Sequence, residues 1–190
     1  TLARLTADYI DDTLGHIIAE LSDAAAHVDT SQTDSGPSIT QLEVIASRLS
    51  IRIANICGVR GDGTVDWSST PLASGSRFDA SIYPSVRETM VTGRVTISGL
   101  VPLPGGGTPV VLLSAAGPLD ATGMPIILVV AVDIVRSGIS GLVQPVRLGT
   151  TGYVEILDQN GIVVARTQPG PEPVPFEVSD HSGRFAALIA

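Results

Sequence analysis

The chain has 190 residues and a formal net charge of −8, which suits one domain of ordinary size with part of a second. Hydrophobic residues make up 44% of the chain and charged residues 16%, so a sizeable core is available. All 11 basic residues are arginines, scattered singly along the sequence. This pattern argues against nucleic-acid binding. The lack of lysine excludes a Walker A phosphate loop, a Schiff-base lysine and a protein-kinase active site.

Three features bear on the compartment and on the ends of the chain. The longest apolar run, Met124 to Val132, is far shorter than the ~20 residues that a membrane-spanning helix needs. The chain begins at Thr1 without a signal-peptide pattern and ends in an apolar run, so we expect a piece excised from a longer protein. The single cysteine, Cys57, excludes an internal disulfide.

Residues 1–28 carry the strongest helical pattern. Apolar side chains recur at alternating spacings of four and three, which places them on one stripe of a helix. The same alternation is the seam of a coiled coil, so a core-packing helix and a signalling stalk that pairs with a second copy are alternatives. The stripe consists of Ile10, Leu14, Ile17, Leu21, Ala24 and Val28.

The next segment predicts a helix and a hairpin. Residues 29–37 are small and polar, hence a loop, and a capping-box sequence at Ser38 opens a short helix to about Leu49. Residues 51–59 and 64–69 predict two strands around a glycine-rich turn.

A loop at 71–78 then leads into a short helix over 84–91, with Pro84 at its first turn and Gly93 after its end. Three strands follow, joined by short Gly/Pro loops that favour antiparallel pairing. They cover 94–101, 109–116 and 125–133.

The remaining residues predict a linker and a second hairpin. Residues 134–143 contain two glycines, which favours a linker over a core helix. Residues 153–157 and 162–166 predict two strands around a turn, and prolines exclude a regular element from 167 to 178. A terminal helix over 179–190 completes the order, which is that of an α+β protein with one antiparallel sheet of five strands.

Four stretches resemble the double Cache sensor region of bacterial transmembrane receptors, in which two PAS-like modules follow one long N-terminal helix. Residues 61–69 (GDGTVDWSS) resemble its first hairpin, and 75–93 (GSRFDASIYPSVRETMVTG) resemble the loop and helix that line the pocket. Residues 109–133 resemble the paired strands that end in a recurrent acidic position. Residues 151–161 (TGYVEILDQNG) resemble the first hairpin of the membrane-proximal module.

The resemblance implies a long N-terminal helix plus a PAS-like five-stranded antiparallel sheet with flanking helices, followed by the start of a second PAS-like module. It divides the chain into an N-terminal stalk helix and loop (1–37), a membrane-distal module (38–140) and a linker with a truncated membrane-proximal module (141–190). A complete second module needs on the order of a hundred residues. It also implies a place on the extracytoplasmic face of the cell membrane, in a histidine kinase, diguanylate cyclase or chemoreceptor.

No catalytic or metal-binding set can be assembled from the sequence. His16, His27 and His181 lack partners at metal-ligand spacing. Ser140 misses the nucleophile-elbow pattern because position 142 is Leu. Glycines 105–107 lack a following helix start, so they indicate a turn and not a phosphate cradle. We expect no enzyme activity, no metal and no cofactor.

A binding pocket is the better candidate, because PAS-like modules hold small ligands between the concave sheet face and the loop and helix that cross it. Trp67 and Tyr83 would offer flat faces to a ligand, and Arg87 could hold a carboxylate through two hydrogen bonds. Asp133 ends a nearly all-apolar strand, where an unpaired carboxylate is costly. The predicted ligand-binding residues are Trp67, Ser69, Tyr83, Arg87, Ser98, Ser114 and Asp133.

Structural roles are the alternatives for two of these residues. Asp133 could cap a helix that begins at Ile134, and Arg87 could pair with Glu88 or Asp79 at the surface. The amino-acid-binding branch of the family has a Trp-Tyr pair and further aromatic and acidic positions, of which only isolated counterparts occur here. The expected ligand is therefore a small carboxylate or an amino-acid-like metabolite.

We expect ligand binding in the distal module to move the N-terminal helix and the linker at 134–143. The alternative is a ligand-free structural ectodomain, whose pocket is filled by its own side chains and which forms a homodimer through the N-terminal helix. Nucleic acid is not an expected partner, and contact with a membrane is expected only through flanking segments.

Overall fold

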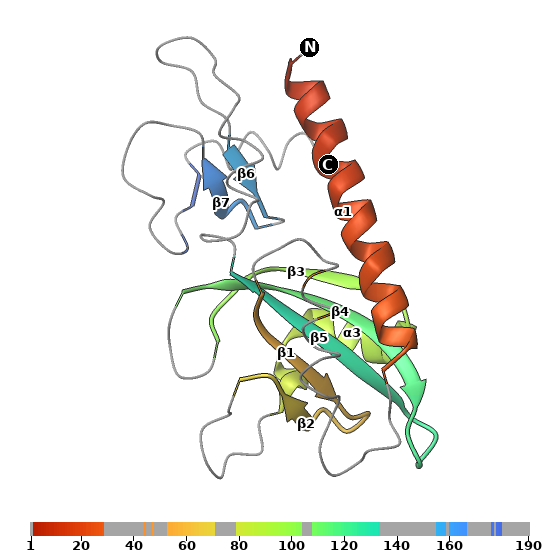
Figure 1. The fold of residues 1–190 in the computed structure, drawn as a ribbon. Coiled ribbons are helices and arrows are strands. Elements are labelled where there is room, and N and C mark those ends of the chain that lie inside the picture. The colour runs from red at the N-terminus through yellow and green to blue at the C-terminus, as the bar shows by residue number, and fades with distance from the viewer. Residues whose placement is uncertain are drawn as a thin grey trace.

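The computed structural model describes residues 2–28, 44, 47, 53–70, 79–103, 108–133, 155–158, 160–166, 176, 178 and 179. Within this part, a long helix precedes a five-stranded sheet, and a two-stranded hairpin follows it (Figure 1). The predicted α+β class is confirmed. The elements are α1 (Leu2–Ala26), β1 (Ile53–Val59), β2 (Val65–Ser68), the 3-10 helix η1 (Ala80–Ile82), α3 (Pro84–Thr92), β3 (Thr96–Val101), β4 (Val110–Leu119), β5 (Pro125–Asp133), β6 (Glu155–Leu157) and β7 (Val163–Arg166).

The five strands form one antiparallel sheet in the order β2-β1-β5-β4-β3. The hairpins predicted between neighbouring strands are present, and β1 also pairs with β5, from Ile53 opposite Val132 to Val59 opposite Ile127. The first and last strands of the sheet are therefore neighbours at its centre. This order gives the PAS-like fold that the sequence predicted.

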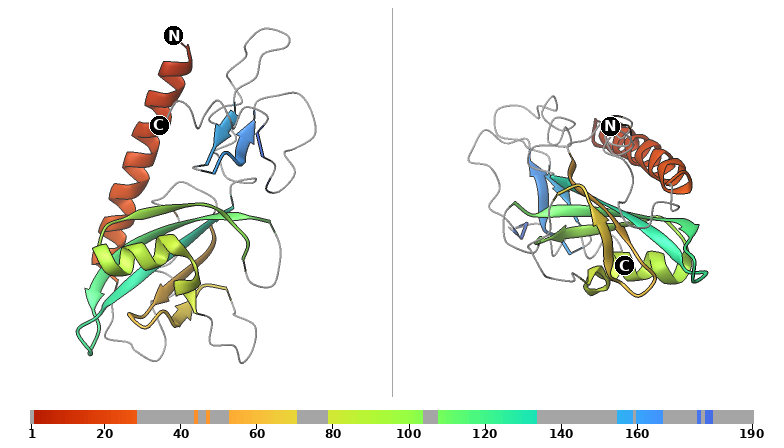
Figure 2. Two further views of the ribbon diagram at one scale, coloured as in Figure 1. Left: turned by 180° about the vertical axis from the view of Figure 1, so that it is seen from behind. Right: turned by 60° about the horizontal axis from the view of Figure 1, so that its bottom comes forward.

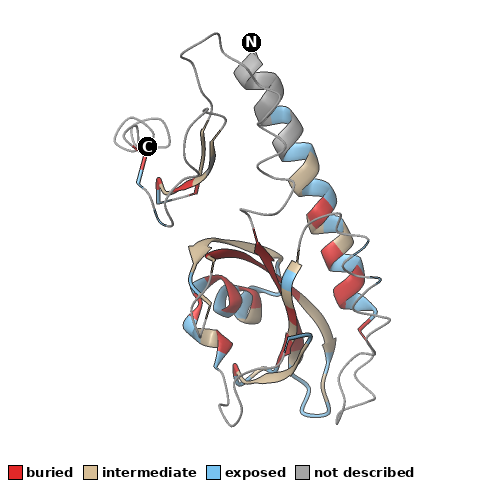
Figure 3. Ribbon diagram, turned by 60° about the vertical axis from the view of Figure 1, so that its left-hand side comes forward, coloured by how far each residue is buried: buried red, intermediate tan, exposed pale blue. Residues whose placement is uncertain are grey.

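The two faces of the sheet are covered by different helices (Figure 2). Along β4 and β5, successive side chains alternate between two separate cores, as strand geometry requires. On the α1 face, α1 packs against Ile56, Val111, Leu113, Ala115, Leu128, Val130 and Val132. On the α3 face, η1 and α3 pack against Val59, Val110, Leu112, Ile127, Val129 and Ala131. Both faces of the central strands are thus buried (Figure 3).

The apolar stripe of α1 packs against the sheet from Ile17 onward. Ile17, Leu21, Ala24 and Val28 are buried in the core of the α1 face, and Leu21 has no exposed surface. Core packing, one of the two alternatives for the stripe, therefore accounts for its C-terminal part. The N-terminal half of the helix extends beyond the sheet, where Leu14 is partly exposed (Figure 1).

Several boundaries differ from those predicted. η1 was not anticipated, because a single turn of three residues has no periodicity to detect; Asp79 stabilises it by accepting a hydrogen bond from Ser81 N–H at 2.8 Å. β4 continues to Leu119 through Gly117 and Pro118, with a shift of register after Ala116. In the predicted second helix, Val44 and Ser47 are helical. The rest of that helix, the linker at 134–143 and the predicted terminal helix beyond Ser179 lie outside the described residues.

Candidate functional site

Tyr83 joins α3 to the edge of the sheet. Its side chain is buried in the core of the α3 face, and its hydroxyl donates a hydrogen bond to the Pro102 carbonyl at 2.8 Å. Burial raises the pKa of the Tyr83 phenol, so the group stays protonated and remains a donor. This placement agrees with the prediction that the segment bearing Tyr83 covers the sheet.

Buried hydroxyl groups gather where α3 crosses β3 and β4. The Thr89 and Thr96 hydroxyls lie 2.7 Å apart, and Thr96 Oγ1 donates to the Ser85 carbonyl at 2.8 Å. The single Thr89 hydroxyl hydrogen also has the Ser114 carbonyl within reach, as a longer second acceptor at 3.4 Å. Among the described residues, the Oγ atoms of Ser85 and Ser114 are buried without a hydrogen-bond partner, a state that costs free energy unless another group reaches them.

Asp133 lies on the α3 face at the end of β5. It pairs with Val110 of the α3-face core, and the preceding Val132 belongs to the opposite core, so alternation directs the Asp133 side chain toward the α3 face. Only 8% of the residue is exposed. The predicted capping role concerns residues from Ile134 onward, which lie outside the described part.

Arg87 lies one helical turn beyond Tyr83, and its backbone N–H donates to the Tyr83 carbonyl at 3.2 Å. Its side chain is exposed, and no ion pair to Glu88 or Asp79 is found in the described part of the chain. Its charge contributes to lowering the pKa of Asp79, after the larger effect of the hydrogen bonds from Ser81. The guanidinium is thus available at the edge of the α3 face.

Trp67 lies on the opposite face of the sheet. Its ring packs against the α1-face core and covers Gly58, its partner across the β1–β2 ladder. Trp67 and Tyr83 therefore do not line a common surface. In a regular strand, residues two positions apart share a face, so Trp67 would lie on the α3 face with Val65. A register shift between Gly58 and Val59 breaks the regularity.

Ser69 and Ser98 hold the sheet together. Ser69 Oγ accepts from Ile56 N–H at 2.9 Å and donates to Asn55 Oδ1 at 2.9 Å, joining β2 to β1. Ser98 Oγ accepts from Leu112 N–H at 2.8 Å and donates to the Gly99 carbonyl at 2.6 Å, within a bulge of β3. These contacts are structural, and a ligand-binding role for either residue stays a prediction.

Cys57 also lies on the α3 face, although the sequence alone indicates only that it cannot form an internal disulfide. It packs against the α3-face core, and burial raises the pKa of its thiol to about 12. A Cys57 thiolate would raise the pKa of the Tyr83 phenol, so the two side chains lie close enough to interact. Successive strand residues face opposite sides of a sheet, and Ile56 faces α1, so strand alternation places Cys57 on the α3 face.

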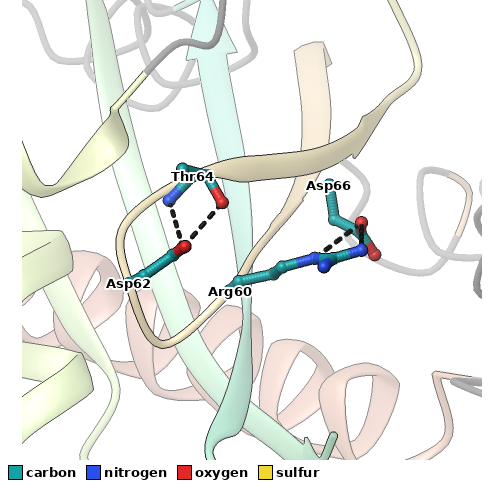
Figure 4. Close-up of polar contacts among 4 residues, drawn as sticks. All are labelled: Arg60, Asp62, Thr64 and Asp66. Carbon is teal, nitrogen blue, oxygen red and sulfur yellow. Dashed lines mark hydrogen bonds and ion pairs between the residues drawn. The ribbon is translucent and has the colours of Figure 1, made fainter.

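Charged side chains gather at the turn between β1 and β2 (Figure 4). Arg60 forms an ion pair with Asp66 and donates from Nε to Asp66 Oδ1 at 2.8 Å. Asp62 accepts from Thr64 N–H at 2.9 Å and from the Thr64 hydroxyl at 2.6 Å, and these bonds lower the pKa of its carboxyl. The charges are thus satisfied within the hairpin itself.

Two further observations concern the described residues alone. No group of three or more His, Cys, Asp or Glu side chains in that part of the chain is arranged to hold a metal ion. Among the same residues, no helix combines the length and the apolar character needed to cross a membrane.

Comparison with known proteins gives matches in structure but not in sequence. No protein-family model and no curated protein matches the chain. The extracellular ligand-binding receptor of Desulfohalobium retbaense is similar at a TM-score of 0.65 and 12% identity, over 98% of this chain and 33% of the receptor. The ligand-binding domain of the Pseudomonas aeruginosa amino-acid chemoreceptor PctB, in complex with L-Arg, matches at a TM-score of 0.63 and 12% identity, over 90% of this chain and 64% of that domain.

The sensory domain of the Campylobacter jejuni chemoreceptor Tlp3, with isoleucine bound, matches at a TM-score of 0.58 and 15% identity, over 87% of this chain and 66% of that domain. The chain thus spans about a third of the Desulfohalobium receptor and less than two thirds of the PctB domain. At these identities the likeness concerns the fold. The chain has the fold of the extracellular ligand-binding domains of bacterial chemoreceptors.

Proposed function

We propose that the chain is the small-molecule-sensing part of the extracytoplasmic region of a bacterial transmembrane receptor. The observation that carries the proposal is the contrast between the two faces of the sheet. The α1-face core consists of apolar side chains, whereas the α3 face adds a buried carboxylate and buried hydroxyls to its apolar core. Apolar surface with a few polar groups is the usual composition of a small-ligand site.

The polar groups of the α3 face favour a ligand with an amine, a carboxylate or both. Asp133 would accept hydrogen bonds from an ammonium group, and Arg87 at the edge of the face would hold a carboxylate. The Tyr83 ring would provide an apolar wall. The similar PctB and Tlp3 domains were solved with L-Arg and isoleucine, which supports an amino-acid-like metabolite, with a small carboxylate as the alternative.

We propose three parts for the chain: a stalk helix and loop over 1–37, the distal sensing module over 38–140, and a linker with the opening of a second PAS-like module over 141–190. The five-stranded sheet and α3 belong to the second part. The β6–β7 hairpin, a separate two-stranded sheet, belongs to the third. The output of the receptor, whether histidine kinase, diguanylate cyclase or chemoreceptor, would reside in another part of the protein, and the chain itself would not be catalytic.

The experiment that tests the proposal is a thermal-shift screen with amino acids, organic acids, amines and purines, followed by calorimetry on any hit. A ligand at 100 times its Kd stabilises the folded state by about 2.7 kcal/mol, which a thermal shift detects easily. Failure of every metabolite class to stabilise the chain would contradict the proposal.

Two pairs of variants locate the site of a hit and distinguish the ligand classes. Asp133→Asn should weaken a ligand that carries an amine, and Asp120→Asn is its control, because Asp120 lies in the exposed turn at the other end of β5. Arg87→Gln should weaken a ligand that carries a carboxylate, with the exposed Arg94→Gln as control. Equal affinities in each pair would place the ligand elsewhere.

A homodimer through α1 is a second proposal, supported by the extension of the N-terminal half of the helix beyond the sheet (Figure 1). Leu14 is the informative position, because it is partly exposed on that stripe, whereas Leu21 is fully buried within the chain. Sedimentation at increasing concentration should show association that Leu14→Asp abolishes. A chain that stays monomeric at all concentrations would contradict this proposal.

A further inference from the structure

Three hairpin turns in the described part of the chain share one backbone geometry. In each, a residue donates its backbone N–H to the carbonyl of the residue four positions later, and its own carbonyl accepts from the N–H of a glycine with positive φ, at Gly63, Gly123 and Gly161. This is the turn of a three-residue hairpin loop with a glycine bulge. The β4–β5 and β6–β7 turns also share their first residue, an aspartate: Asp120 and Asp158.

The two aspartates stabilise their own turns in the same way. Asp120 Oδ1 accepts from the N–H groups of Thr122 at 2.8 Å and Met124 at 3.1 Å. Asp158 Oδ1 accepts from the equivalent N–H groups of Asn160 at 2.8 Å and Ile162 at 3.0 Å. The stabilisation of a turn therefore requires only one carboxylate oxygen.

The second oxygen of Asp158 makes a contact that has no counterpart at Asp120 among the described hydrogen bonds. Asp158 Oδ2 accepts from Leu100 N–H of β3 at 3.1 Å, across 58 positions of sequence. The hydrogen bonds of Asp120 lie in an exposed turn, whereas only 9% of Asp158 is exposed. A carboxylate is buried in this way only where donors satisfy it.

The β3 side of the contact is shaped to receive the carboxylate. β3 is an edge strand of the described sheet, so its outward N–H groups have no neighbouring strand to bond within that part of the chain. A bulge between Ile97 and Leu100 is held by Ser98, whose hydroxyl bonds both Leu112 N–H and the Gly99 carbonyl. Gly99 leaves room for the aspartate, since a Cβ there would lie 2.5 Å from Asp158 Oδ2 and 3.3 Å from Asn160 Nδ2.

The β6–β7 hairpin is braced as one unit behind this contact. Arg166 Nε donates to Glu155 Oε1 at 2.8 Å, and the Ser179 hydroxyl donates to Glu155 Oε2 at 2.6 Å. Val164 packs against the α1-face core of the main sheet. A displacement at the Asp158 turn would therefore move the hairpin as a whole.

We propose that Asp158 and the β3 bulge at Ser98–Leu100 form a latch that couples the five-stranded sheet to the β6–β7 hairpin, so that a shift of β3 is transmitted to the hairpin. This hydrogen bond joins the two sheets, and it lies on a strand that α3 packs against. A conformational change that begins at α3 would thus reach the hairpin through a hydrogen bond that can form or break.

Residue-resolved hydrogen exchange on the whole chain tests the latch, with one variant on each side of the contact. Asp158→Asn keeps an oxygen for its own turn and replaces the acceptor of Leu100 N–H with an amide. Gly99→Ala fills the space that the carboxylate occupies while leaving every hydrogen bond of the hairpin turn in place; its φ lies outside the left-handed region, so the added methyl is strained only by its contacts. Asp120→Asn is the control, because it perturbs a turn of the same backbone geometry that has no latch.

Exchange of the Leu100 amide should become about 10-fold faster or more in both latch variants, as expected for loss of a hydrogen bond to a charged group. Amides of Ile156 and Val163 in the hairpin should become faster in Gly99→Ala, and the double variant should resemble the single ones because all remove the same contact. Asp120→Asn should affect only Thr122 and Met124. Unchanged Leu100 exchange in Asp158→Asn, or an unchanged hairpin in Gly99→Ala, would overturn the proposal.

Discussion

The indole ring of Trp67 lies directly against the α-carbon of Gly58, its partner across the β1–β2 ladder. A Cβ at position 58 would overlap the ring atoms Nε1 and Cε2, so a glycine in the interior of β1 is a requirement of packing. The ring joins β2 to the core beneath α1. The single tryptophan of the chain therefore reports on the α1 face and not on the α3 face.

Gly58→Ala should displace the indole and destabilise the fold. Overpacking of this kind costs about 1–3 kcal/mol, measured as the free energy of unfolding in urea, and the emission of the only tryptophan should move to longer wavelength. Gly15→Ala is the control, since a Cβ there meets nothing within 4 Å and alanine favours a helix. A Gly58→Ala variant as stable as the original chain would show that the ring has another position to occupy.

The hydroxyl cluster beneath α3 should respond differently at two positions. Thr89→Val keeps the shape of a fully buried side chain and removes its bonds to Thr96 and Ser114, so it should cost about 1–2 kcal/mol. Ser114→Ala removes a buried hydroxyl that has no partner in the described part of the chain, and should be neutral or stabilising. Thermal unfolding of both variants measures the difference. A cost above about 1 kcal/mol for Ser114→Ala would reveal a group bound to its hydroxyl.

Acid should destabilise the fold through the aspartates of its turns. Hydrogen bonds from Thr64, Ser81 and Thr122 lower the pKa values of their partner carboxyls at Asp62, Asp79 and Asp120. A carboxyl whose folded pKa lies below the unfolded value of about 3.9 contributes stability above that pH and loses it as the pH falls through the folded pKa. The free energy of unfolding should therefore decrease below about pH 4.

Thr64→Val and Thr122→Val should raise the pKa values of Asp62 and Asp120 and flatten this acid dependence. Carboxyl-carbon NMR titration gives the pKa values, and urea unfolding at several pH values gives the slope. Thr92→Val is the matched control, because the Thr92 hydroxyl donates to the Glu88 carbonyl and not to a carboxylate. Unchanged titration in the two turn variants would show that backbone N–H groups alone set these pKa values.

The reactivity of Cys57 should report on the α3 face. Burial raises the pKa of its thiol to about 12, so at pH 8 its thiolate fraction is roughly a thousandfold below that of a free cysteine. Alkylation by iodoacetamide should be slow in the folded chain and rapid in urea. Equal rates in the two states would mean that the thiol is not enclosed by the α3-face core.

Much of the fold follows from local patterns in the sequence. The 125–133 strand has the predicted boundaries, because a short continuous apolar run bounded by Gly123 and Asp133 is typical of a buried strand. The α1 stripe follows from a different pattern, the alternating spacings of four and three that place apolar residues on one side of a helix. Local patterns do not reveal η1, whose one turn depends on the Asp79 side chain.

The candidate site was harder to predict, because which face a strand residue occupies depends on register. Trp67 was placed with Tyr83 on the strength of its aromatic ring, but a bulge between Gly58 and Val59 and the absent side chain of Gly58 direct it to the α1 face. The Ser98 hydroxyl bonds Leu112 N–H within a bulge, a contact that the sequence does not predict, and its ligand-binding role stays a prediction. Bulges depend on pairing with distant strands, which a single sequence does not specify.

The most direct test of small-molecule sensing on the α3 face is a titration of the isotope-labelled chain followed by backbone amide NMR, with amino acids and small carboxylates as probes. The account predicts saturable shifts that are largest at Tyr83, Ala131 and Asp133, all on or at the end of elements of that face. Shifts that are largest at Ile17, Leu21 and Val111 of the α1 face, or no saturable shift with any probe, would contradict it.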